Sequence, residues 1–252
     1  MMTRRATLET ACGVIQGGRL TVRYERSALS AEEARAFAAL AAQGLREIER
    51  LAGLTARTRL RFELRSATRI STARGRTIEL STSRVAARSA PYLHEIAHVL
   101  LPCRHAPPWF SEGLACYLES VLSESGCGYD SHLFTQDGNR SVDADAARWL
   151  ADPRGKNVLP FIGTRGAPPG LVADRQNVAA PFYVLSHSFV KFLAAQAGFP
   201  SIIRLARVRN FSSVLRRFSG KTSAAWRSLW LQRITPAGAL HQSSSNRNTL
   251  GG

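Results

Sequence analysis

The feature of this sequence that most constrains its fold is a short apolar stretch into which polar side chains are set at helical spacing. Residues 91–102 read PYLHEIAHVLLP, with a proline suited to the first turn of a helix at one end and a helix-stopping proline at the other. Four residues of α-helix turn the chain through about 400°, so His94 and His98 lie one turn apart on one side. The fold must therefore accommodate two imidazoles and the carboxylate of Glu95 on a largely buried helix.

These three polar groups predict a metal site. Polar and charged side chains are costly to bury unless they are paired, hydrogen-bonded or bound to a metal. The HExxH spacing lets His94 and His98 reach one Zn²⁺, with Glu95 beside them to hold a water molecule. The alternative, two hydrogen-bonded core histidines, does not account for the adjacent carboxylate. We therefore expect Zn²⁺ bound by His94 and His98.

A catalytic zinc site usually has three protein ligands and an open fourth position, so a third ligand is expected. Residues 107–119 read PPWFSEGLACYLE. This segment resembles the second zinc helix of the gluzincin metallopeptidases, whose pattern W-[LF]-[NS]-E-G-[FL]-A supplies a glutamate ligand, and it is closest to compact, peptidase MA-like members. The resemblance implies Glu112 as the third metal ligand. His105, in the connecting loop, is a rival for that position.

The resemblance also implies a function and further site residues. It implies a zinc metallopeptidase, a hydrolase acting on a peptide or protein substrate, in which Glu95 is the general base for a metal-activated water. It implies that Glu119, seven residues beyond Glu112, contacts a ligand histidine, although a solvated helix charge is the other interpretation. Cys103 and Cys116 could bind metal as thiolates, and we interpret Cys116 as helix packing.

A hydrolytic zinc site also needs a hydrogen-bond donor for the developing oxyanion. Residues 183–193, YVLSHSFVKFL, resemble the downstream gluzincin helix that begins with a catalytic tyrosine, which implies that role for Tyr183. The Glu-Lys-Gly that follows this tyrosine in the aminopeptidases is absent. His187, one turn further on the same face, is the alternative oxyanion donor. The alternative to a catalytic role is that Tyr183 is a core aromatic residue and His187 is a surface residue.

The strand that precedes the HExxH helix departs from the aminopeptidase pattern. Aminopeptidases of this clan carry a Gly-x-Met-Glu-Asn strand whose glutamate anchors the free amino terminus of the substrate, whereas residues 76–80 here read RTIEL. This departure from the family pattern favours an endopeptidase, or an enzyme of unknown substrate, over an exopeptidase. In zincins such an edge strand pairs with an extended substrate, and TIELS is the candidate.

Periodicity predicts an α+β fold: a small N-terminal mixed sheet with the HExxH helices, followed by a mainly helical C-terminal subdomain. The resemblance implies that this fold is zincin-like. Strands are expected at residues 19–25, 59–65 and 77–80, a capped helix from Ser30 to about Gly53, and helices at 108–123, 143–150, 180–197, 201–218 and 222–234. The predicted segments are 1–18, an N-terminal extension; 19–123, the zincin-like subdomain; 124–180, a loop-rich connection; 181–235, the helical subdomain; and 236–252, a disordered tail.

The strongly basic composition supports an alternative class of function. Lys and Arg total 34 against 18 Asp and Glu, a formal net charge of +16, which suits a nucleic-acid-associated protein with a structural or inactive zinc site. The arginines are scattered along the chain, so we favour the interpretation that they form an ordinary solvated surface.

The four cysteines have no CxxC spacing and are expected to be reduced. No transmembrane run or secretory signal is recognised, so a cytoplasmic location is expected as written, or export if the true start lies upstream.

Overall fold

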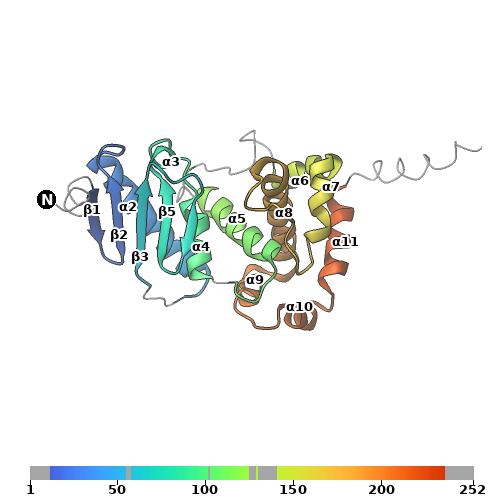
Figure 1. Ribbon diagram of the computed structural model, residues 1–252. Coiled ribbons are helices and arrows are strands. Elements are labelled where there is room, and N and C mark those ends of the chain that lie inside the picture. The colour runs from blue at the N-terminus through green and yellow to red at the C-terminus, as the bar shows by residue number, and fades with distance from the viewer. Residues whose placement is uncertain (1–11, 55–57, 102, 125–128, 130–140, 236–252) are drawn as a thin grey trace, which may run out of the picture. The chain divides into compact units, whose positions relative to one another are not determined.

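The computed structural model describes residues 12–54, 58–101, 103–124, 129 and 141–235 (Figure 1). The predicted α+β class is confirmed: a small N-terminal sheet is followed by a mostly helical remainder. Two compact units result. Among the described residues, unit 1 comprises 12–54, 58–101, 103, 114–124 and 129, and unit 2 comprises 104–113 and 141–235. The predicted tail, 236–252, lies outside the described residues.

The sheet of unit 1 has five strands in the order β1-β2-β3-β5-β4. Strands β2, β3 and β5 run parallel, while β1 and β4 are antiparallel edge strands. The three predicted strands are confirmed as β2, β3 and β5, because alternating apolar residues fill the core side of each. The bounds are β1 (Cys12–Gly17), β2 (Leu20–Glu25), β3 (Leu60–Arg65), β4 (Thr72–Arg74) and β5 (Thr77–Ser81).

Both edge strands depart from the sequence expectation. Strand β1 lies inside residues 1–18, which were expected to be an extension, and its Gly13 pairs with Tyr24 of β2. A Cβ at Gly13 would overlap the outer part of the Tyr24 ring, so a side chain at this position would displace that ring. Strand β4 covers the outer side of β5, so the expectation that TIELS forms the edge is wrong and β4 is the edge strand.

Helices α2 (Ala31–Leu51), α3 (Thr82–Ala86) and α4 (Tyr92–Leu100) complete the N-terminal part of unit 1. The predicted capping box forms at Ser30, whose Oγ accepts from the Glu33 N–H at 3.2 Å while Glu33 Oε2 accepts from the Ser30 N–H at 2.8 Å. Helix α2 packs on β1 and β2 and against α4, which packs on β4 and β5 (Figure 1). A Cβ at Gly44 would overlap the Leu93 side chain, so this glycine lets α2 and α4 approach closely.

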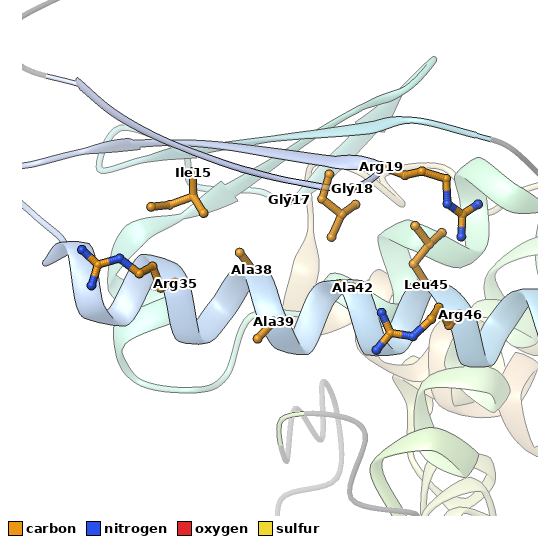
Figure 2. Close-up of a pocket in the computed structure, with 11 residues that line it drawn as sticks. Ile15, Gly17, Gly18, Arg19, Arg35, Ala38, Ala39, Ala42, Leu45 and Arg46 are labelled. Atoms are coloured by element: carbon orange, nitrogen blue, oxygen red, sulfur yellow. The ribbon is translucent and has the colours of Figure 1, made fainter.

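A groove of about 460 Å³ runs between the β1–β2 hairpin and α2 (Figure 2). The small side chains of Ala38, Ala39 and Ala42 leave it open. At one end, Arg19 forms a two-point ion pair with Glu49, with N–O distances of 2.5 and 2.6 Å. Hydrogen bonding to Glu49 raises the pKa of Arg19, so this guanidinium stays charged and is neutralised within the protein.

Unit 2 is helical and centres on α8 (Ala180–Ala197), which packs against α6, α7, α9 and α11. Trp230 of α11 donates its indole N–H to Ser188 Oγ at 2.9 Å, and Ser188 donates to Asp143 Oδ1 of α6 at 2.7 Å. This buried chain of hydrogen bonds ties three helices together. The other bounds are α6 (Val142–Ala151), α7 (Pro153–Val158), η1 (Leu159–Phe161), η2 (Arg175–Ala179), α9 (Phe199–Leu205), α10 (Phe211–Ser219) and α11 (Ser223–Ile234).

Two helical segments differ from the sequence expectation. The helix expected at 143–150 is present as α6, but residues 152–180 of the expected loop-rich connection also contain α7 and two short helices, because Asp152 caps a helix N-terminus. The single helix expected at 201–218 is instead α9 and α10, since Asn210 caps a new helix by accepting from the Ser213 N–H.

One helix among the described residues, Arg175–Ala197, is long and apolar enough to cross a membrane by length and composition. Sequence inspection did not recognise it, because Lys191 and the polar residues of η2 interrupt the apolar run. Within its most apolar window 67% is buried inside the protein, and Phe182 and Phe189 are fully covered, as in the core helix of a folded unit.

Candidate metal centre

Helix α4 carries the HExxH residues in a buried setting. Its side chains His94 and Glu95 are only 4% and 6% exposed, and His98 is half-buried. The helix is held in place by Tyr92, whose ring packs edge-on against Phe37 of α2 with centroids 5.6 Å apart. The apolar residues of α4 therefore fix its rotation, and this rotation sets the direction of both imidazoles.

Helix α5 (Pro108–Glu124) carries Glu112 near its start. In unit 2, Trp109 stacks at 4.8 Å on Phe189 of α8, and Phe110 packs at 4.7 Å on Phe211. At Gly113 a Cβ would overlap the backbone carbonyl oxygen of Ser186, so only glycine permits this approach of α5 to α8. The residues on both sides of Glu112 thus anchor its position on the helix.

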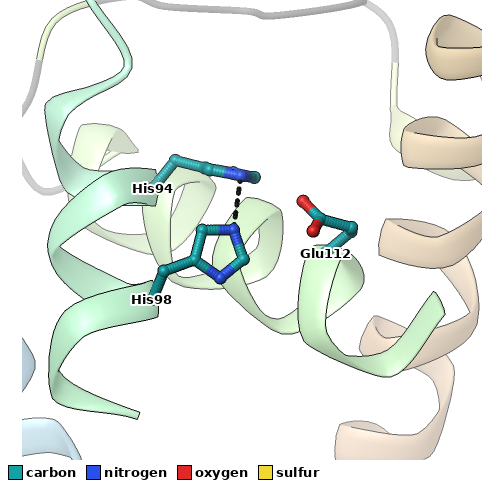
Figure 3. A group of neighbouring side chains, drawn as sticks. All are labelled: His94, His98 and Glu112. Carbon is teal, nitrogen blue, oxygen red and sulfur yellow. Dashed lines mark hydrogen bonds between the residues drawn. The ribbon is translucent and has the colours of Figure 1, made fainter. Parts of the chain in front are cut away.

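The two imidazoles and the Glu112 carboxylate point toward one another (Figure 3). The Nε2 atoms of His94 and His98 are 3.0 Å apart, and the ligand atoms of all three residues lie within 4.8 Å of one another. Among the described residues, this is the one group of three or more His, Cys, Asp or Glu side chains with such convergence. The structure therefore brings together the three side chains predicted to bind metal.

The donor set fits zinc. Two nitrogens bound at about 2.0–2.1 Å to a tetrahedral Zn²⁺ lie about 3.3 Å apart, close to the observed separation of the two Nε2 atoms. Two imidazoles and one carboxylate are also a donor set that zinc prefers, and three protein ligands leave an open coordination position. The buried carboxylate of Glu95, next to His94 in the sequence, would be stabilised by a divalent cation.

Other predicted residues around this group can be located. Glu119 is buried, at 5% exposed, so it is not the solvated helix charge that was the alternative interpretation. His105 is exposed and is not part of the converging group. Cys116 was interpreted as helix packing in preference to a thiolate metal ligand, and its Sγ lies 3.7 Å from Nδ1 of His94. This contact was missed because a cysteine on an apolar helix face carries no distinctive sequence signal.

Tyr183 and His187 lie on α8 at the predicted helical spacing. Both are half-exposed on a helix whose neighbouring side chains are mostly buried, and they lie one turn apart on the same side. Tyr183 is therefore not a fully buried core residue. Its role and that of His187 stay predictions.

Comparisons with known proteins bear on the fold. No family model matches the chain, and no curated protein matches it. Among solved structures, a variant of an M1 zinc metallopeptidase from Deinococcus radiodurans bound to a Tyr-Ser-Ala substrate is similar, with a TM-score of 0.52, 16% identity and 89% of this chain covered. A variant of a two-domain M1 zinc metallopeptidase bound to L-tryptophan gives a TM-score of 0.51, also at 16% identity and 89% coverage.

The chain spans only about half the length of these structures, 51% and 50% respectively. At this level of identity the likeness concerns the fold. The described residues thus share a peptidase-like fold with part of M1 zinc metallopeptidases, and the His94, His98 and Glu112 group lies within that fold.

Proposed function

We propose that this protein is a zinc-dependent metallopeptidase that cleaves internal peptide bonds. The observation that carries the proposal is the convergence of His94, His98 and Glu112 within 4.8 Å, on two helices of a peptidase-like fold. The HExxH order places Glu95 next to the first histidine, as a hydrolytic site requires and a purely structural zinc site does not.

The site residues would have separate roles in metal binding and proton transfer. His94 and His98 would hold the metal through Nε2, and Glu112 would add one negative charge. When bound, zinc supplies Lewis acidity that polarises a carbonyl oxygen and lowers the pKa of water. The Glu95 carboxylate would accept the proton of the attacking water and return it to the leaving amine nitrogen.

A donor for the developing oxyanion is assigned to Tyr183, in keeping with the family resemblance. Its half-exposed position on α8 is compatible with contact between Tyr183 and a substrate, which supports this role. His187, equally half-exposed one turn later, is the alternative. A loss of turnover in His187→Ala, with Tyr183→Phe unaffected, would move the assignment to the histidine.

The preference for internal bonds follows from the edge strand. Residues 72–74 of β4 are Thr-Ala-Arg and carry no carboxylate that could anchor the free amino terminus of a substrate. An extended peptide could add to the outer side of β4 through main-chain hydrogen bonds alone. A peptide with a blocked amino terminus should therefore be cleaved; activity confined to free amino termini would contradict this part of the proposal.

The experiment that tests the proposal measures hydrolysis of a blocked peptide library by wild type and Glu95→Gln. We expect hydrolysis that stops with a chelator and returns with zinc, and a loss of about 10²–10⁴-fold in Glu95→Gln with zinc content unchanged. Glu32→Gln, the same change at an exposed position of α2, is the matched control and should act like wild type. Turnover that survives chelation, or a Glu95→Gln variant at the wild-type rate, would overturn the proposal.

The alternative of a basic nucleic-acid-associated protein has a separate test. Binding to nucleic acid that falls steeply with salt, together with no metal-dependent hydrolysis, would favour it.

A further inference from the structure

The side of the His94 ring that faces away from His98 is in contact with a sulfur atom. While Nε2 of His94 points toward His98 at 3.0 Å, Nδ1 lies 3.7 Å from Cys116 Sγ. Both side chains are buried, at 4% and 8% exposed. This sulfur–nitrogen contact is therefore shielded from competing water.

Cys116 occupies a defined position on α5. It follows Glu112 by four residues, so the two side chains lie one turn apart on the same side of the helix. One helix thus carries both a candidate metal ligand and the side chain that touches another candidate ligand. A shift of α5 would move the Glu112 carboxylate and the sulfur beside His94 together.

A neutral imidazole has one N–H and one lone pair, and the hydrogen bond at one nitrogen decides which form is held. A metal bound at Nε2 leaves the hydrogen of the neutral ring at Nδ1, where the Cys116 sulfur at 3.7 Å is placed to accept it. We infer that Cys116 is a positioning residue for His94, which it holds with Nε2 ready to bind metal. This inference rests on the proposed zinc site.

The same geometry argues against Cys116 as a metal ligand. Its sulfur lies on the Nδ1 side of the ring, and it is not part of the group of converging ligand atoms among the described residues. Sulfur is a weaker hydrogen-bond acceptor than a carboxylate, so it holds the ring less firmly than an acidic residue in that position would. A carboxylate at residue 116 should therefore strengthen zinc binding.

The test compares zinc affinity across variants that separate packing from hydrogen bonding. Cys116→Val keeps most of the side-chain volume and removes the acceptor, whereas Cys116→Ala removes both. Loss of a partner that orients a metal-binding histidine typically weakens metal affinity 10–100-fold, and for a sulfur acceptor we expect about 10-fold in both variants. Cys116→Asp should bind zinc at least as tightly as wild type, and Cys12→Ala, on β1, is the control that should not change.

Two measurements read the outcome. Competition with a chelating dye gives the zinc dissociation constant, and ¹⁵N NMR of histidine-labelled protein reports which nitrogen of His94 carries the hydrogen. We expect hydrogen at Nδ1 in wild type, and a mixture of both forms in zinc-free Cys116→Val. Zinc affinity in Cys116→Val equal to wild type, or a hydrogen held at Nε2 in zinc-free wild type, would overturn the inference.

Zinc binding by the wild-type protein distinguishes failure of the proposed function from failure of the inference about Cys116. If wild type binds no zinc, the proposed function falls and the inference falls with it. If wild type binds zinc and affinity among the variants follows thermal stability, with valine intact and alanine impaired, only the inference is wrong and Cys116 acts through packing.

Discussion

Replacement of Gly113 by alanine tests how tightly α5 is held beside the candidate ligand Glu112. The new Cβ would overlap the backbone oxygen of Ser186 and lie 2.7 Å from its carbonyl carbon. Because backbone atoms cannot rotate away, we take the upper range for overpacking, about 3 kcal/mol. Alanine is better than glycine in a helix by about 1 kcal/mol, which leaves a net loss of about 2 kcal/mol in the free energy of unfolding.

The assay is urea unfolding followed by tryptophan fluorescence. All four tryptophans, at positions 109, 149, 226 and 230, belong to unit 2, so their signal reports the unit that contains the Gly113 contact. Gly17→Ala, followed by circular dichroism, is the control, since a Cβ at this position of β1 would meet nothing within 4 Å and should change stability little. A Gly113→Ala variant as stable as wild type would refute the close helix contact.

Three further predictions concern other residues. Tyr183→Phe should lower kcat about 10²–10³-fold with the melting temperature unchanged, and intact kcat would remove its role as oxyanion donor. Ser188→Ala leaves the Trp230 indole N–H without its acceptor and should cost about 1–3 kcal/mol in the free energy of unfolding; no loss would contradict a buried network. Hydrogen bonds from Arg154 lower the pKa of Asp152 to about 2, so its contribution to stability is complete above pH 3.8 and lost as the pH falls toward 2. In Arg154→Gln, NMR titration should find the pKa of Asp152 raised, and an unchanged value would exclude the Arg154 side chain as a cause.

The elements that sequence predicted are those with strong periodicity. Strands β2, β3 and β5 alternate apolar and polar residues, and α2 combines a capping box with an apolar stripe, so local pattern and tertiary burial agree. Strand β1 was missed because Gly13 is unfavourable in a strand by itself and lies under the Tyr24 ring of the neighbouring strand. Strand β4 has three residues and no apolar alternation, so its pairing with β5 has no local signature.

The candidate site also contains features that the sequence predicted and features that depend on tertiary packing. The positions of His94 and His98 follow from helical geometry, and Glu112 from its motif. By contrast, the contact of Cys116 with His94 depends on how α4 and α5 pack, which no local pattern encodes. The close approach at Gly113 is likewise a tertiary property, visible only once Ser186 is seen opposite it.

X-ray absorption of zinc in the purified protein tests the central claim most directly, because it identifies the atoms bound to the metal. The arrangement of His94, His98 and Glu112 predicts one zinc per chain with only nitrogen and oxygen neighbours at about 2.0–2.2 Å. In His94→Ala the imidazole signal of the zinc that remains bound should fall to that of one histidine, His98. A sulfur neighbour at about 2.3 Å, which Cys116 or Cys103 would supply, or a protein that retains no zinc, would contradict the account.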